Sequence, residues 1–581
     1  MFKFNVMRIY LCLIIFSTVF ANAQTEIKWK KSFGGSQSEY FQKQVKSTDS
    51  NFVFAGSTNS SDGDLSINYG SHDVVVSKIT KEGNILWTKM FGGNNFDTPS
   101  DMIKTSDGGV VLTVLSRSNT DFFPQHYGGT DSYDVYGIKL DADGNILWNK
   151  FIGGSGEESK ATVVSTNTGY VVAINSKSND FDFESSFGGQ NILVIKFDEA
   201  GNIIWRKNLA GSNDEVFQDL QSFDQQNVLL AINSDSNDGS FSNSTTTIKK
   251  GFFVKINAEG DLVFITPIIT DNPNLDNSVS KINFFNNQYF AVGTERKESF
   301  QAVGTIRHYD AMLVNFSESG SLLWKKNYSW KVSTPNNSET YYDGALFIEQ
   351  TIDNHILLSG VTYINENSMY GINLISSWLK KIDMQGNLVN TIGRTSRTYN
   401  LEKLPNGLFI DHSYKYENGL YGVTSIYDLQ IVSPNGLHFL PSTSFKNALS
   451  TERNSRVSSS LGIIDDENLI LFSNQNNITG SYDTYRNNIW ITRIQSSEFT
   501  TTELASEEVE APKVDIYPNP TSNFIKLTKK ANKISLYDTA GKLLITAKDT
   551  NVIDLTKFLK GVYFLKVKID NKIKSFKVIK N

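Results

Sequence analysis

The chain has 581 residues and a formal charge of −6, from 55 Lys and Arg against 61 Asp and Glu. The charge is uneven, because residues 512–581 hold 15 Lys and only 5 Asp or Glu, which leaves the body of the chain strongly acidic. Nucleic-acid binding depends on Lys and Arg contacts to phosphates, so an acidic body excludes it as the main activity.

Residues 1–23 have the features of a secretory signal peptide. A basic start is followed by a mostly apolar run, residues 9–20, and by Ala21-Asn-Ala23, which fits the small-x-small cleavage pattern. We therefore predict cleavage between Ala23 and Gln24. An uncleaved anchor is the alternative, although the apolar run is short for a membrane span. The only cysteine lies inside this segment, so the mature chain has no thiol chemistry, and no later segment is apolar enough to span a membrane.

The body that follows is built from a repeat. The segment Gly83-Asn-Ile-Leu-Trp87 recurs as Gly144-Asn-Ile-Leu-Trp148 and as Gly201-Asn-Ile-Ile-Trp205. The aromatic residues of successive copies are 57 to 61 residues apart, and they are Trp29, Trp87, Trp148, Trp205, Phe264 and Trp324. A fixed period of about 60 residues predicts a modular array.

Each repeat is expected to contain four strands. In the first full copy the apolar pattern places them near Phe41–Lys46, Phe52–Ser57, Val74–Ile79 and Ile85–Met90, with polar turn residues between them. Gly83 stands in the last turn, and glycine recurs there because a tight hairpin needs a positive φ.

The third strand of the repeat can be counted along the chain. Its eight copies are Val74–Ile79, Val135–Leu140, Ile192–Phe197, Phe252–Ile256, Ala311–Phe316, Ser377–Ile382, Ile426–Ile431 and Ile489–Ile494. The last copy has no Trp strand after it, whereas Trp29–Phe33 is a Trp strand with nothing before it. The two chain ends therefore complete one unit.

Four-stranded units closed in this way predict an all-β fold, a β-propeller over residues 24–499. Eight blades is the expected number, and seven is the alternative because the sixth and seventh copies are degenerate. An open solenoid is a further alternative, which the split unit disfavours.

The segment Leu140-Asp-Ala-Asp-Gly-Asn-Ile-Leu-Trp148 resembles the tryptophan-docking repeat of eight-bladed quinoprotein-like propellers. The resemblance implies that the tryptophans are wedges between neighbouring blades, namely Trp29, Trp87, Trp148, Trp205 and Trp324. Phe264 departs from the pattern, and the units are longer than those of that family. The adjacent cysteine pair of quinoprotein dehydrogenases is absent here, which argues against that activity.

The chain changes character near its C-terminus. Residues 500–512 read as an acidic linker, and residues 513–581 predict a small β-sandwich. This last segment resembles the type A C-terminal sorting domain of type IX secretion substrates, through Val514-Asp-Ile-Tyr-Pro-Asn-Pro-Thr and further motifs in the same order. The matching positions are Pro518, Asn519, Pro520, Gly541 and Gly561.

That resemblance implies engagement with the type IX secretion machinery through this domain. It also implies removal of the domain, and release of the body or its attachment to the outer cell surface. An ordinary adhesive β domain is the alternative reading of residues 513–581.

The long loops of the repeats are expected to gather on one face of the propeller. An acid stands four residues after the closing glycine of the repeat motif in four copies, at Glu39, Asp97, Glu158 and Glu215. Calcium is the one cofactor that the loops suggest, because oxygen ligands suit it, and the candidate ligands are Asp62, Asp64, Asp180 and Asp182. The alternative is that these aspartates form Asx-turns and solvated loops.

No catalytic motif is visible. The six histidines lack metal-ligand spacing, and neither a Gly-x-Ser-x-Gly elbow nor a phosphate loop is present. We therefore expect a secreted or surface-attached binding or scaffold protein, with a polysaccharide or a surface protein as partner. Exposed aromatics for stacking on sugars are expected among Phe122, Phe123, Tyr127, Phe181 and Phe183, and core packing is the alternative role for such residues. The alternative function is an extracellular hydrolase acting on polysaccharide or peptide.

Overall fold

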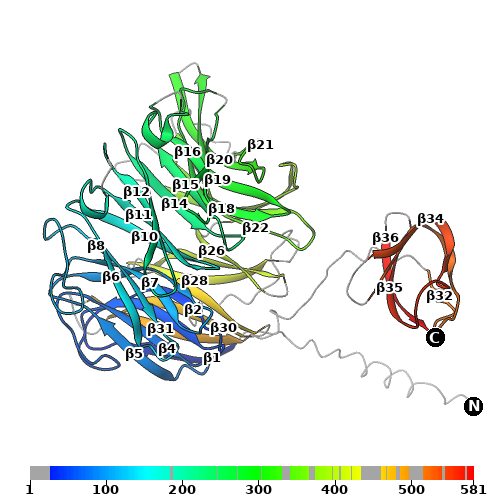
Figure 1. Cartoon of the computed structure of the whole chain (residues 1–581), viewed down its shortest axis with the longest axis horizontal. Coiled ribbons are helices and arrows are strands. Elements are labelled where there is room, and N and C mark those ends of the chain that lie inside the picture. Colours follow the sequence, from blue (N-terminus) through cyan, green and yellow to red (C-terminus); the bar gives the residue numbers. More distant parts are fainter. Residues whose placement is uncertain are drawn as a thin grey trace, which may run out of the picture. The chain divides into compact units, whose positions relative to one another are not determined.

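The computed structural model forms two compact units, Met1–Thr501 and Thr502–Asn581 (Figure 1). The structure describes residues 26–183, 187–244, 247–270, 272–301, 304–329, 340–365, 373–394, 397–404, 407–419, 422–432, 459–465, 468–478, 485–495, 514–538, 543–569 and 572–581. The predicted signal peptide with Ala23 and Gln24, the linker 500–512 and Gly541 lie outside these residues. Within them, no helix has the length and apolar character needed to cross a membrane.

The first unit is a series of antiparallel sheets. Four sheets of four strands come first: β2 (Glu39–Lys46), β3 (Phe52–Thr58), β4 (Asp73–Ile79) and β5 (Ile85–Phe91); β6 (Asp97–Lys104), β7 (Val110–Ser116), β8 (Asp134–Leu140) and β9 (Ile146–Ile152); β10 (Glu158–Thr166), β11 (Gly169–Ser176), β12 (Asn191–Phe197) and β13 (Ile203–Leu209); β14 (Glu215–Gln221), β15 (Val228–Ser234), β16 (Lys250–Ile256) and β17 (Leu262–Pro267). Two 3-10 turns lie in their long loops, η1 (Phe181–Phe183) and η2 (Gly239–Phe241).

The later sheets are less uniform. An eight-stranded sheet consists of β18 (Asn277–Phe285), β19 (Gln288–Gln301), β20 (Gly304–Phe316), β21 (Leu322–Tyr328), β22 (Thr340–Gln350), β23 (Ile356–Asn365), β24 (Asn373–Ile382) and β25 (Leu388–Arg394). Its two antiparallel halves are joined by one parallel pair, Tyr309 with Tyr342. A three-stranded sheet follows, with β26 (Arg397–Lys403), β27 (Phe409–Gly419) and β28 (Gly422–Val432).

The two ends of the unit meet in one sheet. It contains β29 (Ser459–Asp465), β30 (Asn468–Ile478), β31 (Tyr485–Gln495) and β1 (Glu26–Phe33). Strand β1 runs antiparallel to β31, with Trp29 opposite Arg493 and Phe33 opposite Ile489. The predicted closure by the N-terminal Trp strand is therefore confirmed, and Figure 1 shows the sheets following the chain in order from blue to gold.

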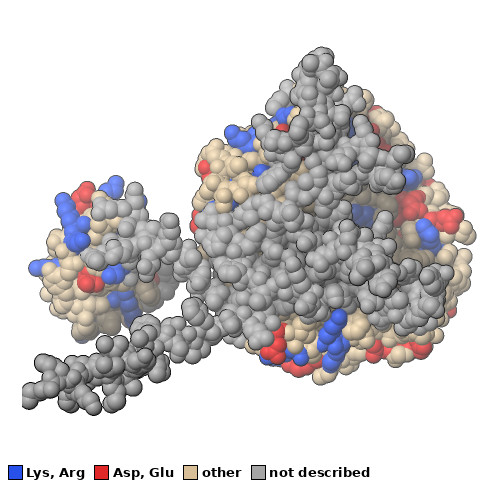
Figure 2. Space-filling view, turned by 180° about the vertical axis from the view of Figure 1, so that it is seen from behind, with Lys and Arg blue, Asp and Glu red and all other residues tan. Residues whose placement is uncertain are grey.

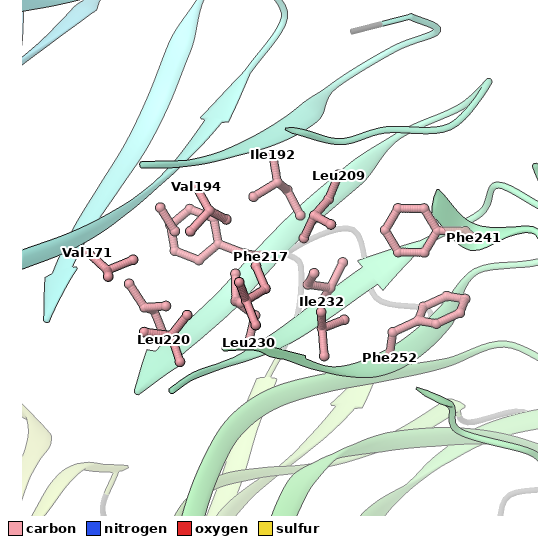
Figure 3. Packing of buried hydrophobic residues seen from close by; sticks show 14 residues of the cluster. Val171, Ile192, Val194, Leu209, Phe217, Leu220, Leu230, Ile232, Phe241 and Phe252 are labelled. Atoms are coloured by element: carbon pink, nitrogen blue, oxygen red, sulfur yellow. The ribbon is translucent and has the colours of Figure 1, made fainter. Parts of the chain in front are cut away.

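The middle strands of each sheet are buried on both faces. Every residue of β3, β4, β8 and β12 is buried, so these strands lack the polar alternation of a sheet with one wet face. Their side chains contact the next sheet along the chain. In Figure 3, Val171, Ile192 and Val194 of one sheet face Phe217 and Leu230 of the following one.

Such clusters link each sheet to its neighbour, and the last links the end to the beginning. Ile470, Phe472 and Ile489 share a cluster with Phe41 and Phe52. The all-β propeller class is thus confirmed, because the last described sheet packs against the first and takes in strands from both ends of the unit. The number of eight blades stays a prediction, since residues 433–458, between β28 and β29, lie outside the described residues.

The second unit is a five-stranded β domain. It contains β32 (Ile516–Tyr517), β33 (Phe524–Tyr537), β34 (Leu543–Asp554), β35 (Gly561–Ile569) and β36 (Lys572–Lys580), in the order β32-β33-β35-β36 with β34 also paired to β33. Apolar residues alternate along β35 and fill a single core with Ile534 and Leu536. Asn519, in the predicted sorting motif, holds the last strand, since its side chain donates to Lys577 O and accepts from Ile579 N.

Candidate functional site

The repeated tryptophans contact the turn of the next sheet. The indole N–H of Trp148 donates to Glu199 O at 3.1 Å, and a Cβ added to Gly201 would lie 2.8 Å from the Trp148 ring. Gly201 has φ +78°. The turn glycine therefore serves two purposes: it adopts a left-handed conformation, and it leaves room for a ring that covers the turn.

The same contact repeats along the chain. Trp87 donates to Ala142 O, and Trp205 donates to Ala258 O. The rings of the other copies also lie against the glycine of a neighbouring turn, in the pairs Trp29 with Gly83, Phe264 with Gly320, and Trp324 with Gly386. A phenylalanine can thus replace tryptophan in the ring contact, but it cannot donate the hydrogen bond.

The acids after the Gly-Gly turns are buried in the loops. Glu39, Asp97, Glu158 and Glu215 are all fully buried, each at the first position of the first strand of its sheet. Their carboxylates accept hydroxyl hydrogen bonds from the last residue of the second strand of the same sheet and from the long loop that follows it. The donors are Thr58 and Ser60, Ser116 and Ser118, Ser176 and Ser178, and Ser234.

Burial raises the pKa of several of these acids. The pKa of Asp97 rises to about 7, against the lowering effect of the Ser116 and Ser118 hydroxyls. Burial also raises the pKa of Glu158 and of Asp134, whose carboxyl groups share a hydrogen bond, so the pair retains a proton. His126 Nδ1 lies 2.7 Å from Asp134 Oδ2. These groups tie loops together and are not open to a substrate.

The candidate calcium ligands accept backbone hydrogen bonds instead of facing one another. Asp62 accepts from Ser36 N at 2.7 Å and Asp64 from Gly34 N at 3.1 Å. Asp180 accepts from Ser155 N and Asp182 from Gly153 N. Among the described residues, no group of three or more His, Cys, Asp or Glu is placed to hold a metal. Calcium binding stays a prediction. The four N–H donors lie 25 to 30 residues away along the chain, so these contacts are not Asx-turns.

The predicted aromatic residues separate into two sets. Phe123 and Phe183 are fully buried core residues, so the prediction that they are exposed was wrong. Phe181 is 54% exposed, and its ring is stacked on Tyr127 with 4.0 Å between the centroids and 16° between the planes. Sequence alone could not separate the sets, because Phe181 and Phe183 flank one aspartate in the same loop.

Phe181 also has an unusual backbone. Its φ is +52°, and the residues at the same place in the other loops are Gly63, Asp121 and Gly239, which all have positive φ. The equivalence rests on the residue before each. The side chains of Asp62, Thr120, Asp180 and Asp238 all accept from the backbone N–H of the first residue after a Gly-Gly or Ala-Gly pair. A left-handed backbone costs a residue with a side chain about 1–2 kcal/mol.

A second feature lies at the other ends of the first strands and was missed from the sequence. A cavity of about 720 Å³ is bounded by the first strands of five sheets, β2, β6, β10, β26 and β29. Lysines at the ends of β2 and β6, Lys46 and Lys104, line it. Both lysines are the last residue of the first strand of their sheet, and this shared position could have predicted that they lie near one another. From the sequence, only the long loops were considered, and they lie at the opposite ends of these strands.

Residues 515–581 match the family model of the secretion system C-terminal sorting domain. The second unit is a type IX C-terminal sorting domain. The domain implies that the chain is exported through the type IX system to the outer surface or the extracellular space. Figure 2 shows Lys side chains at several places on this unit, in keeping with its 15 lysines.

Comparisons of the whole chain are less specific. No curated protein matches it. Among solved structures it is similar to the WD40 domain of SCAP from fission yeast, at 11% identity with 82% of this chain and 98% of that chain covered and a TM-score of 0.31. It is also similar to the full extracellular region of plexin A4, at 9% identity, 94% and 61% coverage, and a TM-score of 0.34. At TM-scores this low, the two similarities say nothing about the fold beyond the sheet topology described above.

Proposed function

We propose that the exported propeller is a non-catalytic binding protein whose long-loop face takes a polysaccharide on the Tyr127–Phe181 ring pair. The observation that supports this most is the strained, exposed Phe181. Backbone strain persists where the surroundings enforce it, and it gathers at binding and catalytic sites. An exposed aromatic face is a suitable surface for the apolar face of a sugar ring.

The surroundings of the ring pair hold it in place. Tyr127 N donates to the buried Asp134, and the residue after Phe181, Asp182, accepts from Gly153 N and pairs with Arg206 at 2.8 Å. A ring held by such contacts loses little conformational entropy on binding. The same contacts leave Arg206 at the surface as a hydrogen-bond donor for hydroxyl groups.

The alternative, a hydrolase, has less support. Glycosidases need two carboxyl groups facing a substrate across about 5–10 Å. The acids of this face are buried against serine hydroxyls or accept backbone N–H groups. We therefore rank binding above hydrolysis.

The proposal can be tested with the variant Phe181→Gly in the full chain. Relief of the left-handed strain, about 1–2 kcal/mol, offsets the lost ring contact, about 0.5–1.5 kcal/mol. The variant should therefore keep the melting temperature of the wild type. Binding to soluble polysaccharides, measured by retardation in gels containing laminarin, xylan, galactomannan or pectin, should fall at least tenfold.

Asp121→Gly is the matched control, because it removes the same strain from another loop without touching the ring pair. It should leave retardation unchanged. Equal retardation of wild type and Phe181→Gly in every polysaccharide, or none by the wild type, would overturn the proposal. Release of reducing ends during the assay would favour the hydrolase.

A further inference from the structure

The cavity at the ends of the first strands has the dimensions of a ligand site. Its volume of about 720 Å³ lies within the range of about 300–1,000 Å³ that is usual for small-molecule pockets. The first strands begin at the long-loop face, which carries the Tyr127–Phe181 pair, and they end at the cavity. The two sites are therefore separate. The residues lining it are Gln42, Lys43, Gln44, Val45, Lys46, Met102, Ile103, Lys104, Ser165, Glu402, Ser460 and Leu461.

The cavity is basic inside an acidic body. Lys43 is neutralised by Asp101, at 3.0 Å. Lys46 donates only to a backbone carbonyl, Ile464 O, and the exposed Lys104 has no ion-pair partner among the described residues. Two ammonium groups thus remain on one wall without a carboxylate partner, and such groups attract an anion.

One polar atom in the wall also lacks a partner. The side-chain amide of Gln44 donates to Leu461 O at 2.8 Å, and a carbonyl oxygen can only accept, so this contact fixes the orientation of the amide. Gln44 Oε1 is then buried without a hydrogen-bond donor. This oxygen is shielded from solvent, so a ligand in the cavity does not reach it.

We propose that this cavity binds a short acidic oligosaccharide of the uronate class. Its carboxylates pair with Lys46 and Lys104, and Ser165 and Ser460, which also line the cavity, offer hydroxyl groups to the sugar. A neutral sugar leaves the two lysines without a partner, and a small inorganic anion makes no contact with the hydroxyl groups.

The test is calorimetric titration of the full chain with trigalacturonate, with maltotriose as the neutral comparison. Wild type should bind trigalacturonate more tightly than maltotriose, and the affinity should fall as salt is raised. Lys46→Gln and Lys104→Gln should each weaken binding about tenfold. Lys81→Gln is the matched control, because this exposed lysine lies in a turn at the same end of the sheets but outside the cavity.

The Lys-rich sorting domain can bind anions as well, and the substitutions separate the two contributions. Binding that survives both lysine substitutions, or that falls equally in Lys81→Gln, would overturn the proposal. So would equal affinity for maltotriose. Phe181→Gly should leave trigalacturonate binding at the cavity unchanged, so failure of the ring-pair proposal and failure of this one are distinguishable.

Discussion

The first four sheets and the two halves of the eight-stranded sheet fulfil the same structural requirement with different side chains. In β2, β6, β10 and β14 the first residue is a buried acid that accepts serine or threonine hydroxyls. In β18 that place belongs to Asn277, whose side chain accepts from Gly251 N and donates to Ile268 O. In β22 the corresponding acid is Asp343, three residues after the start of the strand. It lies opposite Thr362 and accepts from its hydroxyl, as Glu39 does from Thr58 in the first sheet.

The comparison shows that the position requires a hydrogen-bond acceptor and not a particular residue. An amide supplies an acceptor and a donor, so it satisfies different neighbours at the same place. The later sheets therefore keep the strand arrangement of the repeat although they have lost its sequence motif. The same is true of Phe264, which keeps the ring contact with Gly320 and gives up the indole hydrogen bond.

The largest expected effect comes from Trp148→Ala. This ring is 7% exposed and fills the space above Gly201, so its removal should lower the free energy of unfolding by about 3–5 kcal/mol. Trp148→Phe, which copies the later sheet, should lose only the hydrogen bond to Glu199 and cost about 1 kcal/mol beyond the change in ring size. Thermal unfolding followed by circular dichroism measures both variants.

Leu147→Ala is the control, because Leu147 is the neighbouring residue and is 53% exposed. It should change stability by less than about 1 kcal/mol. If Trp148→Ala has the same melting temperature as the wild type, the contact of Trp148 with the neighbouring sheet does not stabilise the fold.

The regular half of the fold was accessible from sequence because its determinants are local. Glycine in the turn, the aromatic residue four positions later and the period between copies predict the strands around Trp87, Trp148 and Trp205. The pairing of β1 with β31 was also predictable, because the last repeat lacks a Trp strand and the N-terminal segment is a Trp strand without a repeat before it. The joining of β20 to β22 through Tyr309 and Tyr342 had no such signal, since a parallel pair depends on how two sheets meet.

The candidate site was less accessible, because it depends on which atoms are already paired. The sequence of a loop does not distinguish an aspartate that binds a cation from one that accepts a backbone N–H. Asp62 and Asp180 accept a backbone N–H. Phe181 has a positive φ and follows Asp180, which accepts the backbone N–H of Ser155. Gly63 and Gly239 follow aspartates with the same contact, but this equivalence is found only from the hydrogen bonds of the structure.

A middle-sized effect is expected where the last sheet meets the first. Asn474 of β30 accepts from Phe41 N at 2.6 Å, and Asn175 makes the same contact with Phe217 N between two inner sheets. Either alanine variant leaves a buried N–H without an acceptor and should cost about 1–3 kcal/mol. Thermal unfolding gives this value for each.

Hydrogen exchange sharpens the comparison between the two contacts. Asn474→Ala should raise the exchange of β1 and β31 amides, because it loosens the sheet that holds both chain ends. Asn175→Ala should leave that sheet protected. Equal protection of β1 in the two variants would show that the closing sheet does not depend on Asn474.

The buried acids of the regular sheets predict an unusual pH dependence. Because burial raises the pKa of Asp97 to about 7, the native state binds more protons than the unfolded chain between pH 4 and 7. The contribution is fully present below the unfolded pKa and is lost as pH rises through the folded value. Stability should therefore fall by about 1.4 kcal/mol from pH 6 to pH 8 through this group.

Asp97→Asn removes the titration and keeps an acceptor for the serine hydroxyls, as Asn277 does naturally in β18. Its melting temperature should change less between pH 6 and pH 8 than that of the wild type. Denaturant unfolding at the two pH values measures the difference. Parallel curves for wild type and variant would mean that Asp97 is ionised throughout this range.

The smallest effect is expected from calcium, and it tests whether the loop aspartates of the regular sheets have a use that the later sheets lack. Asp62, Asp64, Asp180 and Asp182 each accept a backbone N–H, and among the described residues no group of three or more carboxylates is placed to hold a cation together. Removal of calcium with a chelator should therefore shift the melting temperature by less than about 2 °C, which is no more than about 1 kcal/mol. A larger shift that disappears in Asp62→Asn and Asp180→Asn would assign calcium to these loops, because asparagine keeps the acceptor oxygen for the backbone and removes the charge that the cation requires.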